Sequence, residues 1–378
     1  MKRKILAAAL SLITLSSCGG EAPEQNTVKP TAEEPEIKRV SFVGCGDNIV
    51  YKGTVMDAAE RSTGERTYNF KPQYDNVKEK IESADIAFIN QETVMDSSRE
   101  LSYYPMFNSP TDMAYDLSEV GYDVVNVATN HMLDKGSDGL SNNIEFLKTM
   151  PYMVIGGYEN NADFMTPRVM EKNGIKIAFA SFTYGTNGMS KSASSDLKIP
   201  YINDDDIKRQ LTMCKENADF VIVSVHWGVE GSMTPSEEQK KTARLMADMG
   251  ADVIVGHHPH VIQPVEWIER ADGGRTLCVY SLGNFAAMQA YDYNMLGGMI
   301  EFDIVKKDED KPYLENVYFT PTVYHFGSNF RNTKVYYLSE YTPELANKHG
   351  VKTRYARHLS IETFNSYVDK TIDAEFLR

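Results

Sequence analysis

Acidic, amide and imidazole side chains recur at one kind of place in this sequence, just after short apolar runs. The residues concerned are Asp47, Glu92, Asn130, His131, His226, His258 and His260. Imidazole and carboxylate groups together suit Zn, Mn, Fe or Co better than Ca. A carboxylate can also bridge two ions that lie about 3.5–4 Å apart. The set therefore predicts a site for two divalent transition metals, which would bind a phosphoryl oxygen and generate hydroxide from water at neutral pH.

The apolar runs are the strand candidates that would position these side chains. They cover residues 39–43, 84–90, 122–128, 175–182, 219–226, 251–256 and 277–281. Several are apolar on both faces, as in 221–225, which is typical of central strands buried from both sides. Amphipathic helical segments separate the runs, so we expect βαβ units and a layered α/β domain. Because open α/β sheets gather their sites at the carboxyl ends of strands, the polar residues should converge.

Two helices carry clear boundary signals. The segment 234–237, Thr-Pro-Ser-Glu, predicts a capping box with proline at the first helical position, and the helix should stop at Gly250. Thr111 is expected to cap another helix that ends at Gly121. Further along, residues 300–338 should form antiparallel strands, and 354–378 are polar and weakly helical. We therefore expect the main domain at 38–305 and an extension of the same domain at 306–378.

The N-terminus has the pattern of a targeting segment. Residues 1–17 combine a basic start with a short apolar core, which indicates a secretory signal and is too short for a membrane span. Cys18 ends a sequence that resembles the lipobox of bacterial lipoproteins, and 18–37 reads as a flexible acidic tether. We expect an exported protein, anchored to the cell membrane or outer membrane by lipid on Cys18 alone. The alternative is an ordinary signal peptide with an incidental cysteine.

The charge balance limits the possible partners. The chain has 39 basic and 53 acidic residues, a net charge of −14. This acidity argues against nucleic acid or an anionic membrane surface, and a polyanionic substrate would need bound cations to reverse the local field. Three further cysteines, Cys45, Cys214 and Cys278, are widely spaced, which makes a disulfide framework unlikely and leaves one isolated bridge open. Cys45 fits a small buried residue better than a metal ligand.

The motifs around the polar residues resemble a known family. They are GD at 46–47, NQE at 90–92, ATNH at 128–131, SVHWGVE at 224–230, GHHPH at 256–260 and YSLGNF at 280–285. This set is similar to the CapA family of poly-γ-glutamate capsule synthesis, a branch of the calcineurin-like metallophosphoesterases, over roughly residues 38–290. The resemblance implies a metallophosphoesterase-like β-sandwich flanked by helices, with a C-terminal β-rich extension.

The resemblance also implies a ligand set. It comprises Asp47, Glu92 and His260 for the first metal, and Asn130, His226 and His258 for the second, with Glu92 as the bridge. His131 would face the leaving group as a general acid, oriented by a neighbouring carboxylate such as Asp134. His257 stands outside this set. The wider superfamily has D-x-H as its first motif, where this chain has Ile49, so the first metal has few protein ligands.

Other site readings are weaker. Gly44 and Gly46 follow a strand, but the third glycine of a dinucleotide loop is replaced by Ile49. The segment 281–284 lacks the GxSxG elbow of a nucleophilic serine, and we expect it to line the metal site through backbone amides.

Three functions fit these observations. The first is a metal-dependent phosphoesterase-like hydrolase in capsule or envelope polymer biosynthesis, with a phosphoester or a poly-γ-glutamate-like anionic polymer as its partner. The second is a non-hydrolytic polymer-binding or export factor that uses the metals to bind anions. The third is a scaffold lipoprotein whose site has decayed.

Overall fold

The computed structural model describes residues 35–64 and 66–378. The signal peptide at 1–17, the lipidation of Cys18 and nearly all of the tether lie outside the described residues and stay predictions. In the described part, no helix combines the length and the apolar character needed to cross a bilayer.

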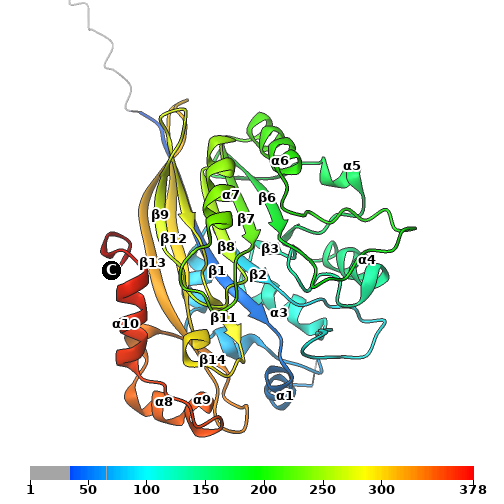
Figure 1. Cartoon of the computed structure of the whole chain (residues 1–378), viewed down its shortest axis with the longest axis vertical. Helices are drawn as coiled ribbons and strands as arrows, with labels where there is room; N and C mark the ends of the chain where they lie inside the picture. Colours follow the sequence, from blue (N-terminus) through cyan, green and yellow to red (C-terminus); the bar gives the residue numbers. More distant parts are fainter. Residues whose placement is uncertain (1–34, 65) are drawn as a thin grey trace, which may run out of the picture. The chain divides into compact units, whose positions relative to one another are not determined.

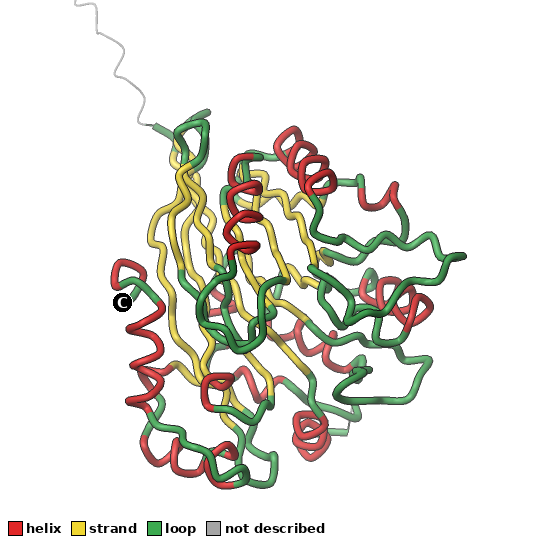
Figure 2. Tube along the Cα trace, viewed as in Figure 1, coloured by secondary structure: helices red, strands yellow, loops and turns green. Residues whose placement is uncertain are grey.

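Two β-sheets form the centre of the protein (Figures 1 and 2). The 8-stranded sheet has the order β14-β13-β12-β1-β2-β3-β4, with β11 also paired to β1. Its strands are β1 Ile37–Ile49, β2 Ile86–Gln91, β3 Val124–Asn126, β4 Met153–Ile155, β11 Asn284–Ala287, β12 Leu296–Lys307, β13 Tyr313–His325 and β14 Lys334–Tyr337. The pairs from β1 to β4 are parallel, whereas β12, β13 and β14 add to β1 as antiparallel strands.

The 6-stranded sheet has the order β5-β6-β7-β8-β10-β9. Its strands are β5 Arg168–Lys172, β6 Ile175–Thr183, β7 Phe220–His226, β8 Val253–His257, β9 Val265–Glu269 and β10 Arg275–Val279. The central pairs are parallel, and β5 and β9 are antiparallel at the two edges. β7 is buried along its whole length, as its β-branched, apolar sequence predicted.

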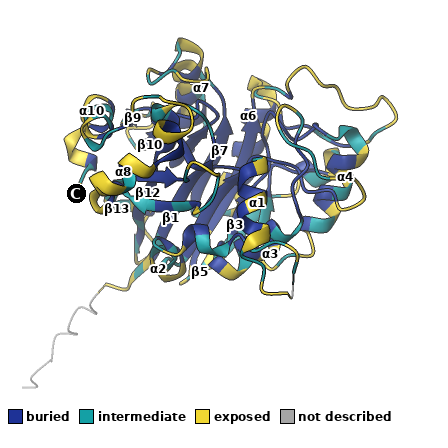
Figure 3. Cartoon of the chain, turned by 90° about the horizontal axis from the view of Figure 1, so that it is seen from below, coloured by how far each residue is buried: buried dark blue, intermediate teal, exposed yellow. Residues whose placement is uncertain are grey.

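The two sheets pack face to face. One apolar core contains Phe42 and Ile89 from the first sheet together with Ile177 and Val255 from the second. A second core covers the outer face of the 6-stranded sheet with helices α6 and α7, through residues such as Met246. Figure 3 shows the buried strands inside and the exposed residues gathered on the surrounding helices. The layered α/β fold expected from the sequence is confirmed.

The helices surround this sandwich. They are α1 Lys52–Glu60, α2 Lys78–Ser83, α3 Asp112–Val120, α4 Gly136–Leu147, α5 Asn161–Phe164, α6 Asp204–Asn217, α7 Glu237–Asp248, α8 Pro343–Lys348, α9 Gly350–Thr353 and α10 Ile361–Thr371. α8, α9 and α10 belong to the region after β14; α10 runs along the outer side of the long antiparallel strands, and α8 and α9 lie below their ends in the view of Figure 1.

The expected strand positions are all occupied by strands, and the expected antiparallel region is confirmed, although it begins earlier, at Leu296. The start of α7 was wrongly predicted. Its N-cap is Ser236, whose hydroxyl accepts from the amide of Gln239 while the Gln239 side chain bonds back to Ser236. Pro235 therefore precedes the helix instead of starting it. The expected ends at Gly121 and Gly250 are correct, and both glycines have left-handed backbones, with φ of +106° and +98°.

The cap of α3 is weaker than expected. Thr111 does occupy the N-cap position, but its side chain makes no capping bond within the described residues. The position was therefore correct, and the hydrogen bond that suggested it is missing.

Candidate metal centre

Four strands deliver polar residues to one edge of the sandwich. Asp47 lies near the end of β1, Glu92 directly follows β2, and His226 and His257 are the last residues of β7 and β8. In the parallel pairing of β7 with β8, His226 is opposite His257. Since parallel strands end at the same edge, the chain places these side chains together as expected.

Glu92 is the most isolated charged group in this cluster. It is 1% exposed, and both carboxylate oxygens lack a hydrogen-bond partner among the described residues. Its Oε1 lies 3.7 Å from Nε2 of His260 and 3.9 Å from Nε2 of both His226 and His131. Burial raises the pKa of Glu92 well above its usual value, and the charge of Asp47 adds to this, while His260 opposes it. A buried acceptor that faces three imidazoles without bonding to them is suited to a cation.

Asp47 is also fully buried but has several donors around it. The side chain of Asn90 donates to Oδ1 at 2.8 Å, and the amide of His258 donates to Oδ2 at 3.2 Å. Nδ1 of His260 lies 3.1 Å from Oδ2, and Nδ1 of His257 lies 3.4 Å from Oδ1. Burial alone would raise the pKa of Asp47, but His257 and His260 hold it well below the usual range. The carboxylate is thus kept ionised, as a metal ligand must be.

The turn that follows β8 has an unusual backbone. His258 and His260 have positive φ angles of +97° and +56°. Non-glycine residues rarely adopt this region, and such backbones cluster at binding and catalytic sites. Burial, followed by the charge of His260, lowers the pKa of His258 to about 3, so its imidazole is neutral. Burial also disfavours the charged form of His260, yet Glu92 and Asp47 raise its pKa to about 9.

Asn130 and His226 form a second pair at the centre. Oδ1 of Asn130 lies 3.0 Å from Nε2 of His226, and burial lowers the pKa of His226 well below its usual value. The Asn130 amide nitrogen donates to Oδ1 of Asn187 at 3.2 Å. Asn187 belongs to the loop after β6 and fixes the amide so that its oxygen faces His226. Sequence reasoning missed Asn187, because nothing in its surroundings marks it apart from other loop residues.

His131 is held in place by contacts with Asp134 and Phe107. Its Nδ1 is 2.7 Å from Oδ2 of Asp134, and the same carboxylate oxygen accepts the amide of Phe107 at 2.7 Å. The Phe107 ring packs edge-on against the imidazole, with 4.8 Å between centroids. Nε2 of His131 is thereby directed towards Glu92. This geometry is consistent with the expected pairing of His131 and Asp134.

Among the described residues, two groups of potential ligand atoms occur, in each of which the atoms lie within 4.8 Å of one another. One consists of Asp47, Glu92 and His226, and the other of Glu230, His258 and His260. Every ligand expected from the sequence therefore lies in or beside this cluster, including Asn130 next to His226. Glu230 is an exposed addition that sequence reasoning did not single out. Its position four residues after His226, in the quoted motif, was the available signal.

The loop at 281–284 contributes differently from the expectation. The amides of Leu282 and Gly283 are bonded to Gly256 and Ser281, so they do not face the site. Instead, the carbonyl of Gly283 accepts the amide of Asp47 at 2.9 Å, and Oδ1 of Asn284 lies 3.1 Å from Nδ1 of His260. The backbone-amide prediction was wrong because those amides are used in local pairing.

The residues beside Asp47 also have clear structural roles. A Cβ at Gly46 would overlap the Gly283 carbonyl oxygen, so glycine is required there for close approach. Cys45 is buried in the main core, with the Tyr122 hydroxyl 3.5 Å from its sulfur. Cys45, Cys214 and Cys278 are free buried thiols in the described part of the chain.

The donors present fit divalent transition metals. Besides both oxygens of Glu92, buried atoms without a hydrogen-bond partner among the described residues include Nδ1 of His226, Nδ1 of His258 and both ring nitrogens of His257. Buried polar atoms are normally satisfied, so their concentration at one place indicates a missing ligand. Neutral imidazole and carboxylate are the donors that such metals prefer.

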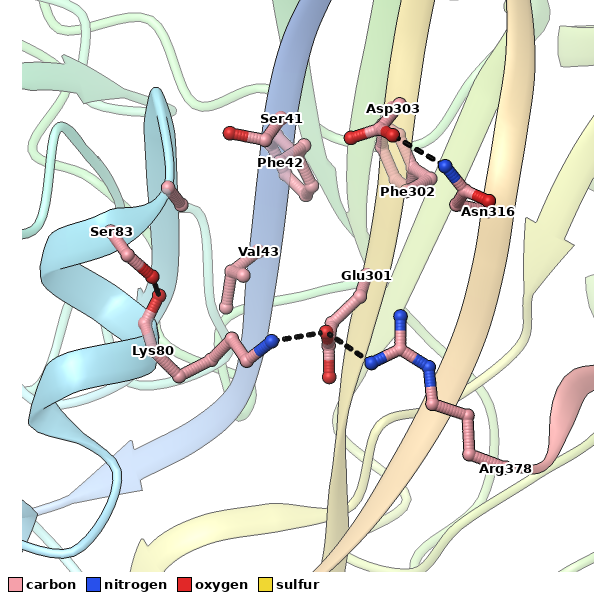
Figure 4. Close-up of a pocket in the computed structure, with 11 residues that line it drawn as sticks. Ser41, Phe42, Val43, Lys80, Ser83, Glu301, Phe302, Asp303, Asn316 and Arg378 are labelled. Carbon is pink, nitrogen blue, oxygen red and sulfur yellow. Dashed lines mark hydrogen bonds and ion pairs between the residues drawn. The ribbon is translucent and has the colours of Figure 1, made fainter.

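In a charged hollow elsewhere in the protein, the charged groups have partners. The hollow has a volume of about 180 Å³ between α2, β1 and β12 (Figure 4). Glu301 is bonded to Lys80 at 2.9 Å and lies 3.8 Å from Arg378, and Asp303 accepts from Asn316 at 2.7 Å. These charges are paired with one another, so this hollow offers no unsatisfied group to a ligand.

Comparison with known proteins finds similarity in the part of the chain that contains this cluster. A family model described as bacterial capsule synthesis protein PGA_cap matches residues 41–289. The chain is 31% identical over 192 residues to capsule biosynthesis protein CapA of Bacillus anthracis, covering 50% of this chain and 46% of the relative. It is 32% identical over 200 residues to PGA biosynthesis protein CapA of Bacillus subtilis (strain 168), covering 50% and 49%. The chain thus spans about half the length of these curated relatives.

The chain is also similar to proteins of known structure. The chain has a TM-score of 0.47 and 12% identity with NAD nucleotidase of Haemophilus influenzae, covering 89% of this chain and 60% of that one. It has a TM-score of 0.44 and 11% identity with calcineurin-like phosphoesterase YfkN of Bacillus subtilis, covering 89% and 99%.

Proposed function

The chain belongs to the bacterial capsule synthesis protein family PGA_cap, and we propose that it is a metal-dependent, phosphoesterase-like hydrolase acting in capsule or envelope polymer synthesis. The observation that carries this proposal is Glu92, a buried carboxylate without a hydrogen-bond partner among the described residues, which faces His131, His226 and His260. The names of the relatives, capsule and PGA biosynthesis proteins, support the envelope polymer as the setting.

We assign the metal-holding role to the residues that converge at the strand ends. They are Asp47, Glu92, Asn130, His226, His258 and His260, with Glu230 as a further candidate. Bound divalent metals would stabilise negative charge on a phosphoryl group and make water a better nucleophile at neutral pH. The protein's own contribution is to keep Asp47 ionised and His258 neutral, both of which favour metal binding.

His131 is the proposed proton donor to the leaving group. Nδ1 of His131 lies 2.7 Å from Oδ2 of Asp134, a contact that fixes the ring and leaves Nε2 to hold the proton to be transferred. Phe107 limits rotation of the ring and keeps water from one side of it. A His131→Ala variant should therefore retain its metals and lose turnover.

The test measures metal content beside hydrolysis of bis(p-nitrophenyl) phosphate, with and without added manganese. We expect two bound metals per chain and turnover, both lost in a His226→Ala, His258→Ala double variant. His358→Ala is the matched control, because His358 is exposed and bonds Thr363 far from the centre. A well-folded double variant with full metal content would refute the proposal.

A second function is favoured by one observation. Ile49 stands where the wider superfamily has a histidine ligand, and it is buried in an apolar cluster with Phe107 and Ala287. A weak first metal would leave a site that binds anions without turning them over, as a polymer-binding or export factor requires. Metal binding without hydrolysis of any phosphodiester would favour this second function.

The lipid anchor is part of the proposal for the envelope location. Cys18 is the proposed attachment point, and labelling cells with a fatty-acid analogue tests it. We expect the label on the wild-type chain and none on Cys18→Ala. Label retained in that variant would refute the anchor.

A further inference from the structure

A cleft of about 530 Å³ opens directly beside the candidate metal centre. Its lining includes His260 and Glu230, which belong to one of the two groups of potential ligands. Its walls carry five tyrosines: Tyr51, Tyr104, Tyr291, Tyr293 and Tyr355. Clefts of this size, next to a reactive centre, are typical of small-molecule sites.

Two of these tyrosines contact His131 indirectly, through the ring of Phe107. Tyr51 and Tyr104 both pack edge-on against Phe107, with centroid separations of 5.4 and 6.3 Å, and Phe107 packs against His131. Tyr104 is 71% exposed, although an aromatic ring on the surface loses the benefit of burial. A ligand that covered Tyr104 would therefore lie close to the proposed proton donor.

The polar groups of the cleft are also connected to the centre. Gln289 donates to the Tyr51 hydroxyl at 3.3 Å and accepts from Asn284 at 3.2 Å. Asn284 in turn lies 3.1 Å from Nδ1 of His260. Together with Glu230, these groups offer both donors and acceptors to hydroxyl groups of a ligand.

Charge limits what the cleft can hold. Of the described residues that line it, none is lysine or arginine, and Glu230 adds a negative charge. Arg357 does not line the cleft but stacks on Tyr291, with its guanidinium carbon 3.5 Å from the ring centroid, and Tyr293 stacks on the same ring. A chain of repeated carboxylates would find no lysine or arginine among the described lining residues. A ligand whose main part is neutral and whose anionic group lies at the metals suits the cleft better than such a chain.

The arrangement of the aromatic rings distinguishes between a nucleobase and a sugar as the neutral part of the ligand. A nucleobase is best held between two parallel rings that are far enough apart to admit it. Here the one such pair among the lining tyrosines, Tyr291 and Tyr293, is stacked on itself at 5.1 Å with an angle of 13°. A sugar ring needs only one aromatic face for its C–H groups and polar partners for its hydroxyls.

We propose that this cleft binds the sugar ring of a phosphorylated carbohydrate and places its phosphoryl group at the metal centre. The inference rests on the proposed hydrolase function for the role of the metals, and names the substrate class of the same site. Tyr104, which is 71% exposed, provides the aromatic ring, and Glu230 and Gln289 bind the hydroxyls.

The test compares ligands by calorimetry on the full chain loaded with manganese. The probes are α-glucose 1-phosphate, glycerol 1-phosphate, adenosine monophosphate and a γ-linked glutamate oligomer. We expect the sugar phosphate to bind most tightly. Tyr104→Ala should weaken it by about two- to tenfold and reduce its advantage over glycerol phosphate. Tyr313→Ala is the control, because Tyr313 is 47% exposed and lies on β13 outside the cleft.

Tighter binding of the nucleotide or the glutamate oligomer would overturn the proposal, as would equal binding of the sugar and glycerol phosphates. A second measurement does not depend on the metals. Saturation-transfer NMR with methyl α-glucoside should show contact that is lost in Tyr104→Ala. No contact in the wild-type chain overturns the inference, whereas contact without metal-dependent hydrolysis overturns only the proposed hydrolase.

Discussion

The protein contains two clusters of buried histidines, and they differ in how their ring nitrogens are satisfied. At the metal centre, nitrogens of His226, His257 and His258 lack partners among the described residues, and carboxylates lie beside them. Between β13 and α9, Nδ1 of His325 is 2.7 Å from the Tyr341 hydroxyl, and His349 has a partner at each nitrogen.

The partners of His349 are backbone groups. The carbonyl of Tyr324 lies 3.0 Å from Nε2, and the amide of Val351 donates to Nδ1 at 3.0 Å. The ring thus joins β13 to α9 and has no remaining capacity for a ligand. Burial of a histidine therefore does not identify a site. Nitrogens left free beside an unpaired carboxylate do.

The largest expected effect concerns Glu92. Glu92→Gln removes a charged ligand, so we expect metal affinity to fall by at least the roughly 10- to 100-fold that is typical when a partner of a metal ligand is lost. The metal-free variant should be at least as stable as the metal-free wild type, because a buried unpaired carboxylate is lost. Titration with manganese and urea unfolding measure the two quantities. Unchanged affinity would remove the distinction between the two clusters.

In the second cluster, the effect should be on stability alone. His349→Ala leaves the Tyr324 carbonyl and the Val351 amide without partners and creates a cavity, so we expect a loss of about 2–4 kcal/mol in the free energy of unfolding. Urea unfolding measures it. Metal content should equal that of the wild type, and a variant that loses its metals would show that the clusters are coupled.

Removal of the metals should lower the thermal stability of the protein, and only through the first cluster. Metal at about 100 times its Kd stabilises the folded chain by about 2.7 kcal/mol, which corresponds to a Tm higher by roughly 3–5 °C for a folded unit of this size. Differential scanning calorimetry with and without chelator measures the shift. It should persist in His349→Gln and vanish in Glu92→Gln. A shift of equal size in both variants would contradict the assignment.

The histidines of the second cluster should make the free energy of unfolding fall gradually as the pH is lowered. Burial lowers the pKa of His349 to about 3 and that of His325 to about 4, below the unfolded value of about 6.5. Below pH 6.5 the unfolded chain binds protons that the folded chain does not, so stability is present above this pH and falls towards pH 4. Each histidine contributes a slope of about 1 kcal/mol per pH unit. His349→Gln should reduce the slope from urea unfolding by that amount, and an unchanged slope would contradict the pKa.

The comparison also explains which parts of the structure could be predicted. β1, β2, β7 and β8 are apolar runs followed by polar residues, and this pattern located both the strands and the cluster. The short strands β4 and β5 were missed, because three to five residues carry little periodic signal. The cap of α7 was misplaced by two residues, since Thr234 and Ser236 have the same capping chemistry and only the fold selects between them.

Some residues of the site could not be found from their own surroundings. Asn284 reaches His260 only because β11 pairs with β1, a contact that local patterns do not encode. His257 was placed outside the ligand set, yet its ring lies 3.4 Å from Asp47. The contact depends on β7 and β8 ending side by side. Long-range pairing therefore decides the details that motifs leave open.

That pairing also fixes when the centre can form. Asp47 is aligned with Asn284 on β11, and Val43 with Glu301 on β12. A chain synthesised from its N-terminus exposes Asp47 and Glu92 early, but the first strand acquires these two neighbours only when nearly all the chain has emerged. An ion bound at this centre would consequently be taken up by the nearly finished chain, and not by one whose synthesis has just begun.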